Sequence, residues 1–218
     1  MIDKLSGQVA IVTGAGQPTG AAIARVLAAA GARVALNDLN PDRLARLAAE
    51  IRAGGGQVID ITADVSNKFQ CVNIIETTRA EWGRIDILVN ATSIEPNVSI
   101  LKMDEWEWMR CLEVNLKGVF LMSQLAGRVM DDQNRIAGRQ SGGIIATIAR
   151  AESPEAGRAA FNAGQAAILA FGRACAREYE PLGIRVQTLV AGGKGVEQTA
   201  AEILWLVTDQ VTVGDTTT

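Results

Sequence analysis

The strongest constraint on the fold is a repeated alternation of short apolar runs with longer segments of helical periodicity. Six runs have the composition of strands: Gln8–Thr13, Arg33–Asn37, Val58–Ala63, Ile85–Asn90, Gly143–Ile148 and Ile184–Val190. Repeated strand–helix units require right-handed crossovers and a parallel sheet. A chain of 218 residues, 48% of them hydrophobic, is long enough to bury one core. The sequence therefore predicts one doubly wound α/β domain over residues 1–218.

Capping residues set the expected helix boundaries. Pro18 suits the first turn of the first helix, and Gly31 follows its end. The other expected caps are Asn40 before Pro41, Ser66 for a helix that stops near Gly83, and Asp104 with Glu107 in capping-box spacing. A further helix is expected from about Arg158 to Glu180. A last strand is expected only as a stub at Val211–Val213.

Composition excludes several classes of function. The net charge is −3 without a basic run, so we expect no nucleic-acid partner. No segment approaches the roughly 20 apolar residues that span a bilayer, so we expect no membrane partner. The chain has no His, and its three Cys residues lack the spacing of a metal site. We therefore expect no metal, and reduced thiols in a cytoplasmic protein.

A glycine-rich turn between the first strand and the first helix predicts a nucleotide site. In the run Thr13–Gly20, glycines allow a tight turn and let backbone amides approach a pyrophosphate at the helix N-terminus. Asp38 follows at the end of the second strand, where it either accepts ribose hydroxyls or merely caps a loop. We favour binding. A carboxylate there repels a 2′-phosphate, so the sequence favours NAD over NADP.

The ordered motifs resemble the short-chain dehydrogenase/reductase family over nearly the whole chain. Thr13–Gly20 resembles its TGxxxGxG turn, Asp86–Asn90 its fourth strand, and Glu113–Phe120 its long-helix signature. The resemblance implies a Rossmann-type doubly wound sheet. It also implies that the cofactor is held by Gly14, Gly16, Gln17, Thr19, Gly20, Asp38, Leu39, Asp64, Val65, Asn90 and Ala91. Pro18 in the turn and Thr92-Ser93 after Ala91 depart from the family pattern and predict weaker binding.

The family's catalytic set is largely replaced. The resemblance implies a Tyr and a Lys four residues later on one helical face, and a Ser after the fifth strand. This chain has Phe161, Gln165 and Arg150 at those places, and only Asn115 is retained. Phe donates no proton, and losing a positioned acid costs roughly 10²–10⁴ in rate. Tyr179, the only tyrosine, is about 27 Å further along the helix at 1.5 Å per residue, so it is out of reach.

Three functions remain open from the sequence. The first is a catalytically impaired or inactive family member that binds NAD(H) as a structural, sensor or partner subunit. The second is an NAD-dependent oxidoreductase for a small alcohol or carbonyl, with Asn115, Arg150 or water as proton source. The third is a pure assembly module. The resemblance implies homo- or hetero-oligomers through helices at about 104–130 and 158–180. The substrate-covering segment after the sixth strand is expected to be shortened.

Overall fold

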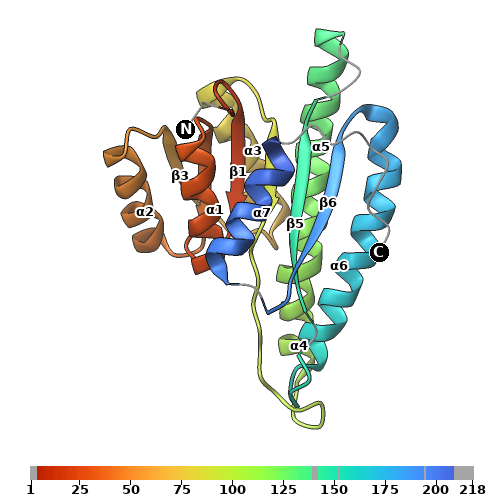
Figure 1. Cartoon of the computed structure of the whole chain (residues 1–218). Helices are drawn as coiled ribbons and strands as arrows, with labels where there is room; N and C mark the ends of the chain where they lie inside the picture. Colours follow the sequence, from red (N-terminus) through yellow and green to blue (C-terminus); the bar gives the residue numbers. More distant parts are fainter. Residues whose placement is uncertain (1–3, 139–141, 152, 194, 209–218) are drawn as a thin grey trace.

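Six parallel strands form one sheet in the order β3-β2-β1-β4-β5-β6 (Figure 1). The computed structural model describes residues 4–138, 142–151, 153–193 and 195–208. The strands are β1 (Val9–Thr13), β2 (Arg33–Asp38), β3 (Val58–Thr62), β4 (Ile87–Asn90), β5 (Ile144–Arg150) and β6 (Arg185–Ala191). The order of the strands reverses between β1 and β4, which pair directly, so this is a Rossmann-type doubly wound sheet. The predicted fold class is confirmed.

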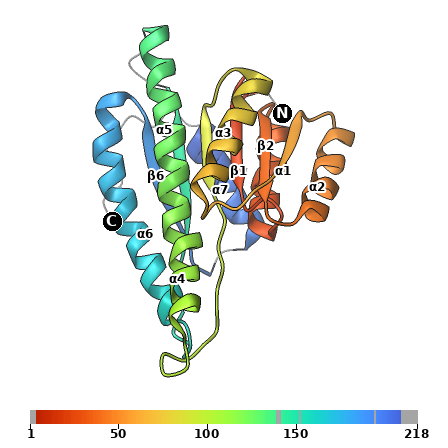
Figure 2. The ribbon, with the colours of Figure 1, turned by 180° about the vertical axis from the view of Figure 1, so that it is seen from behind.

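Helices cover both faces of the sheet (Figures 1 and 2). The α-helices are α1 (Pro18–Ala29), α2 (Pro41–Ala53), α3 (Lys68–Trp82), α4 (Glu105–Leu112), α5 (Gly118–Ala137), α6 (Ala159–Tyr179) and α7 (Val196–Thr208). One apolar cluster joins α1, α2 and α7 to one face, and a second joins α3, α5 and α6 to the other. The right-handed crossovers of the parallel strands place the helices on both sides.

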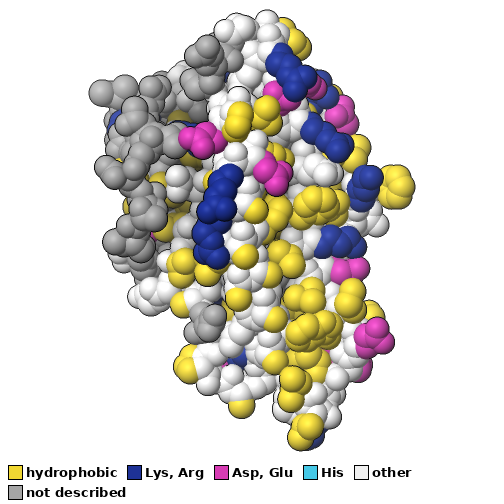
Figure 3. Space-filling model, turned by 90° about the vertical axis from the view of Figure 1, so that its right-hand side faces the viewer, with side chains coloured by type: hydrophobic (Ala, Val, Ile, Leu, Met, Phe, Trp, Pro, Cys, Tyr) yellow, Lys and Arg dark blue, Asp and Glu magenta, His cyan; other side chains and the backbone are white. Residues whose placement is uncertain are grey.

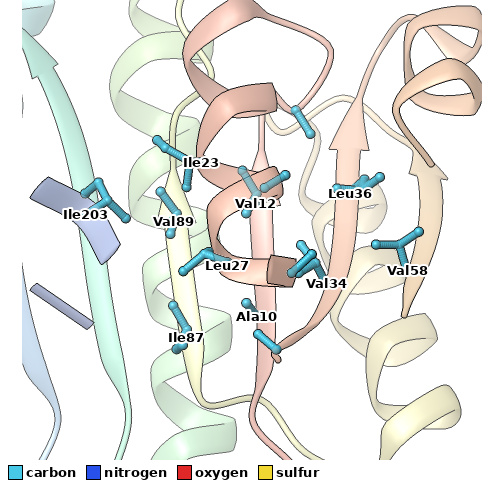
Figure 4. Packing of buried hydrophobic residues seen from close by; sticks show 14 of the residues in the cluster. Ala10, Val12, Ile23, Leu27, Val34, Leu36, Val58, Ile87, Val89 and Ile203 are labelled. Carbon is cyan, nitrogen blue, oxygen red and sulfur yellow. The ribbon is translucent and has the colours of Figure 1, made fainter. Parts of the chain in front are cut away.

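Alternation along β1 shows how the strands serve both clusters. Ala10 and Val12 belong to the cluster under α1, whereas Ile11 belongs to the opposite cluster. Successive strand side chains point to opposite faces, so a strand buried on both sides reads as a continuous apolar run. Figure 4 shows the α1 side, with Ile23 and Leu27 lying over the central strands. The apolar runs in the sequence therefore predicted the strands correctly.

Helix termini differ from expectation at two places. Asn67, not Ser66, caps α3, because its Oδ1 accepts hydrogen bonds from the amides of Phe69 and Gln70. The predicted capping box of Asp104 and Glu107 is confirmed at α4. The single long helix expected from Asp104 is interrupted by a π-helical turn over Glu113–Lys117. The strand stub predicted at Val211–Val213 lies outside the described residues.

The loop after β3 is held to α4 by a charged cluster. Asp64 accepts hydrogen bonds from Ser66 N and Oγ, at 2.8 and 2.7 Å. Arg110 Nη2 donates to the other carboxylate oxygen at 3.0 Å, and its Nη1 donates to Ser66 Oγ at 2.7 Å. Ser66 thus supports Asp64 instead of capping α3. The cluster fixes the position of α4 relative to the sheet.

We expect this cluster to make stability depend on acid. Burial opposes ionisation of Asp64, but the hydrogen bonds from Ser66 and the charge of Arg110 outweigh it, so the pKa of Asp64 lies below its ordinary value of 3.8. A depressed folded-state pKa stabilises the fold above the unfolded-state pKa, and the contribution is lost as pH falls through the folded-state pKa. Asp64→Asn should therefore lower the free energy of unfolding at neutral pH, and its difference from wild type should shrink below pH 3.8.

Urea unfolding at a series of pH values measures this difference. Glu81→Gln, at an exposed position of α3, is the matched control, and its difference from wild type should stay small throughout. A deficit of Asp64→Asn that is equally large at acidic and neutral pH would contradict the assignment.

Candidate functional site

The reversal of strand order places two loops beside each other at the carboxyl edge of the sheet. Thr13 at the end of β1 is paired with Asn90 at the end of β4. The loops that follow contain the glycine turn, residues 14–17, and residues 91–94. In open parallel sheets, ligands bind in the crevice outside the carboxyl ends of the strands at this switch point. Nearly all sequence-predicted cofactor residues lie in or next to these two loops and the neighbouring loops after β2 and β3.

Steric contacts explain the glycines of the turn. Gly14 has φ +65°, and a Cβ there would lie 2.8 Å from Thr92 N and Cα. A Cβ on Gly20 would lie 2.2 Å from Gly14 O, and one on Gly16 would lie 2.7 Å from Asp38 Cγ. Real Cβ atoms do not approach other atoms so closely, so Gly14 and Gly20, which face backbone atoms, exclude a side chain, and one at Gly16 would require Asp38 to move. The turn is therefore a close-packed cradle, as the glycine pattern predicted.

The N-terminus of α1 opens toward this cradle. Gln17 is the N-cap residue, but its side chain makes no capping hydrogen bond, and Pro18 occupies the first turn as predicted. The first helical bond in this region joins Ala21 N to Gln17 O at 2.8 Å, so the amides of Thr19 and Gly20 precede the helical ladder. Such amides, together with the helix dipole, favour an anion.

Asp38 makes the loop-capping contact that the sequence offered as one of its two roles. Its Oδ1 accepts a hydrogen bond from Asn40 N at 3.0 Å, which closes the loop after β2. Its Oδ2 accepts from Gly16 N at 3.1 Å and so also fixes the glycine turn. Leu39 beside it is exposed. Asp38 therefore orders the cradle and still presents its carboxylate at the end of β2.

A small cavity lies between these loops. It measures about 60 Å³ and is lined by residues of all four loops and of α4, among them Gln17, Asp38, Asp64, Thr92 and Arg110. Ligand pockets are typically about 300–1,000 Å³, so a dinucleotide must widen this groove when it binds. Asp64, Val65 and Leu39, which the resemblance implies as cofactor-binding residues, are among those that line it. Arg110 was not predicted, because its pairing with Asp64 spans 46 residues of sequence.

Asn90 and Ala91 are held at the end of β4 by internal hydrogen bonds. The Asn90 side chain is buried and donates to Ser123 Oγ and Thr147 Oγ1, at 3.2 and 3.3 Å. Ala91 N is held by Thr13 Oγ1 at 3.2 Å. Both residues therefore fix the end of β4 by internal hydrogen bonds.

The residues present fit a dinucleotide. Among the described residues, Asn37 Oδ1, Thr92 Oγ1 and Ser93 Oγ are buried oxygen atoms without a hydrogen-bond partner. All three lie at or just beyond the carboxyl ends of β2 and β4. Buried polar atoms are rarely left unpaired, so such a group calls for an explanation. An open helix N-terminus, a glycine cradle and unpaired hydroxyls together suit a ligand that carries phosphate and ribose oxygens.

Phe161 and Gln165 are both buried on the first turns of α6. Phe161 is 1% exposed and packs with Cys111 against Met103 and Trp108. The Arg150 guanidinium lies 5.8 Å from the centre of its ring, within the range of a cation–π contact. Gln165 is 2% exposed, and its Oε1 accepts a hydrogen bond from Arg150 N at 2.7 Å. Both side chains therefore make structural contacts at the positions where the sequence resemblance implies a Tyr and a Lys.

Asn115 has a positioning role in the π-helical turn. Its Oδ1 accepts from Ile94 N and its Nδ2 donates to Ile94 O, both at 2.8 Å. The side chain is fully buried. The Asn115 amide thus makes the two hydrogen bonds to Ile94 that a neighbouring backbone segment would otherwise make. These bonds fix the loop after β4 against α4 and α5.

A carboxylate that sequence reasoning missed joins two arginines near Phe161. Glu95 pairs with Arg150 at 2.9 Å and with Arg158 at 3.7 Å. Arg158 Nη1 also donates to Glu95 O at 2.9 Å. The partners are 55 and 63 residues apart in sequence, and no spacing pattern signals such a contact. The guanidinium of Arg150 is thereby engaged on one side by a carboxylate and on the other by a ring.

The other side chains that could exchange a proton with a substrate lie away from Phe161 or stay protonated. Tyr179 donates from its hydroxyl to Ser123 O at 3.2 Å, and burial raises its pKa to about 12. Burial also raises the pKa of the Cys111 thiol. β6 ends at Ala191 and α7 begins at Val196. In the ranges that the structure describes, no cluster of acidic residues and cysteines could hold a metal ion, and no helix is long and apolar enough to cross a bilayer.

Comparison with known proteins agrees with the sheet and the glycine turn. The short chain dehydrogenase family model matches residues 8–203. The 3-oxoacyl-[acyl-carrier-protein] reductase of Synechocystis sp. is 34% identical over 190 residues, which is 86% of this chain and 74% of that protein. The D-threitol dehydrogenase of Mycolicibacterium smegmatis is 34% identical over 188 residues, 85% of this chain and 70% of that one.

Solved structures give the same result. A metagenomic short-chain oxidoreductase in complex with NADP superposes with a TM-score of 0.86 at 30% identity, covering 94% of this chain and 92% of the other. A short chain dehydrogenase from Burkholderia cenocepacia in complex with NADP has a TM-score of 0.84 at 27% identity, with coverages of 94% and 91%. The chain belongs to the short-chain dehydrogenase family of oxidoreductases.

Proposed function

We propose that this chain binds a nicotinamide dinucleotide at the switch point but does not catalyse the exchange between alcohol and carbonyl that its family performs. In this proposal it acts as a structural, sensor or partner subunit. The observation that carries the proposal is the burial of Phe161 and Gln165 in packing and hydrogen-bond contacts. Neither side chain can give a proton to a substrate oxygen or supply a positive charge.

The missing groups matter because they act together. The nicotinamide supplies the hydride chemistry when it is bound, and the protein must supply the proton. A positioned acid contributes roughly 10²–10⁴ to the rate. Phe161 has no exchangeable proton, and Gln165 is a neutral amide whose oxygen is already occupied by Arg150 N. The short connection between β6 and α7 also provides little cover to exclude water from a substrate.

We further propose NAD(H) as the preferred dinucleotide. Asp38 places a carboxylate at the end of β2, where an adenosine ribose lies in dinucleotide-binding folds, and a 2′-phosphate there would be repelled. NADP(H) is the second candidate, because the two solved relatives described above contain NADP.

Calorimetric titration with NADH and NADPH tests this assignment. We expect NADH to bind and NADPH to bind more weakly, and we expect Asp38→Ala to reduce the difference between them. A ligand at 100 times its dissociation constant stabilises the fold by about 2.7 kcal/mol, so thermal unfolding provides a second readout. Asp42→Ala, in the first turn of α2, is a control near the same loop. Equal affinity of wild type for both dinucleotides would contradict the preference for NAD(H).

The alternative is an NAD-dependent oxidoreductase with a non-standard active site, acting on a small alcohol or carbonyl. The names of the relatives, a reductase and a dehydrogenase, favour it. So does the position of Arg150, whose side chain is half exposed beside Phe161. In this reading Asn115, Arg150 or water would supply the proton, although Asn115 Nδ2 already donates to Ile94 O.

The double substitution Phe161→Tyr with Gln165→Lys distinguishes the two functions. If the present residues are not catalytic, we expect no turnover of alcohols or ketones by wild type and a gain in the double variant. If they are catalytic, wild type turns over and the double variant loses activity. NAD(H)-linked absorbance reports both rates. Detectable wild-type turnover that is lost in Asp38→Ala would contradict the proposal of an inactive protein.

We also propose that the chain forms an oligomer through α4, α5 and α6. Trp106, Met109 and Phe120 are exposed on α4 and α5, and Phe120 contacts Phe171 of α6 edge to face with ring centres 6.3 Å apart. Figure 3 shows apolar side chains gathered on the α6 side of the molecule. Light scattering should give the mass of a dimer or tetramer, and Phe120→Glu should shift it toward the monomer. A monomeric wild type at all concentrations would contradict this interface.

A cytoplasmic location is part of the same proposal. Cys71, Cys111 and Cys175 are free and buried, and unpaired cysteines are usual in a reducing compartment. Burial raises the pKa of Cys71 and Cys175 to about 11, which keeps these thiols protonated and unreactive.

A further inference from the structure

We infer that the Gln17 side chain is a latch across the nucleotide groove, and that the hydroxyls of Thr92 and Ser93 are phosphate-binding groups of this chain that the latch covers. The inference rests on the proposed binding of a nucleotide at the switch point. Its ligand class is any nucleotide with a diphosphate, of which ADP is the simplest.

The latch is visible in the hydrogen bonds of Gln17. Gln17 Nε2 donates to Ser93 O at 3.0 Å and thereby joins the loop after β1 to the loop after β4. An N-cap side chain normally accepts from an amide of the first helical turn, but Gln17 makes no such bond. Its amide group instead spans the two loops where a pyrophosphate would cross from one half of the sheet to the other. A diphosphate at the α1 N-terminus must displace this side chain.

Two unpaired hydroxyls lie beside the latch. Thr92 Oγ1 and Ser93 Oγ are buried and have no hydrogen-bond partner among the described residues. Thr92 lines the same small cavity as Gln17, and its backbone packs directly against Gly14 of the turn. Thr92 thus stands at the wall of the groove, and Ser93 follows it directly in the loop whose carbonyl oxygen holds Gln17. A phosphate oxygen would then satisfy donors that are unsatisfied in the closed groove.

The hydroxyls also replace a donor that the chain lacks. Pro18 has no N–H at the first position of α1, so this helix offers one amide fewer to an anion. The loop after β4 stands opposite this end of the helix, as the bond from Gln17 to Ser93 shows. Hydroxyl donors at residues 92 and 93 thus compensate for the proline. Binding exchanges one neutral hydrogen bond of the latch for two bonds to a charged group, which are the stronger kind.

The experiment compares binding of ADP, NADH and adenosine to three proteins besides wild type. Thr92→Val combined with Ser93→Ala removes both hydroxyls, Gln17→Met removes the latch bond at similar length, and Gln57→Met is an exposed control. We expect the double variant to lose at least about tenfold in affinity for ADP and NADH, as hydrogen bonds to a charged group imply. We expect Gln17→Met to gain about two- to tenfold. Affinity for adenosine, which has no phosphate, should change in neither.

Thermal unfolding without ligand separates binding from structure. Removing an unsatisfied buried hydroxyl should leave the melting temperature of the double variant unchanged or higher, while its affinity falls. Wild-type affinity for ADP in the double variant overturns the inference, as does a loss of stability accompanied by an equal loss for adenosine. If wild type binds ADP but these substitutions do not matter, only the inference fails. If neither wild type nor Gln17→Met binds ADP or NADH, the proposed nucleotide function fails with it.

Discussion

The close backbone approach between Gly14 and Thr92 is the constraint on which the site depends. A Cβ on Gly14 would lie within 2.8 Å of Thr92 backbone atoms, so the loops after β1 and β4 touch without intervening side chains. This contact holds together the same two loops that Gln17 joins through its hydrogen bond to Ser93. It also brings Gly16 within hydrogen-bonding distance of Asp38. The residue types around the turn follow from one steric requirement.

The region of Phe161 differs from the groove in whether its polar and apolar side chains are already engaged in contacts. In the groove, unpaired hydroxyls and an open helix terminus remain available to a ligand. Around α6, the side chains of Phe161, Gln165 and Asn115 are all committed to packing or to backbone hydrogen bonds. The two halves of the site therefore differ in character: one has that of a binding surface, and the other has that of a protein interior.

The fold could be predicted from the sequence because its signals are local. A few neighbouring residues are enough to recognise a continuous apolar run such as that of β1, or a cap such as Asp104 with Glu107. Asn67 was missed in favour of Ser66 because adjacent polar residues offer equally good caps, and the choice depends on the pairing of Ser66 with Asp64 and Arg110. The π-helical turn was missed because the helical pattern of apolar residues continues through it.

The candidate site could be predicted only where a motif marks it. The glycine turn and Asp38 have such a motif, whereas the contacts of Glu95 and Arg110 join residues far apart in sequence and leave no periodic trace. Unpaired hydroxyls at Thr92 and Ser93 are likewise a property of packing, which no composition reveals.

The contacts of Arg150 have a consequence for how this sequence can change over evolutionary time. Its backbone amide bonds to Gln165 while its guanidinium lies over Phe161, so two side chains depend on contacts with one residue. Residues that share a partner show non-additive effects on stability. Substitutions at Arg150 and Phe161 are therefore expected to be epistatic, whereas the bond to Gln165 uses a backbone amide that any residue except proline provides. The local sequence should drift as a linked set, with intermediates that carry a single exchange purged more often than combinations.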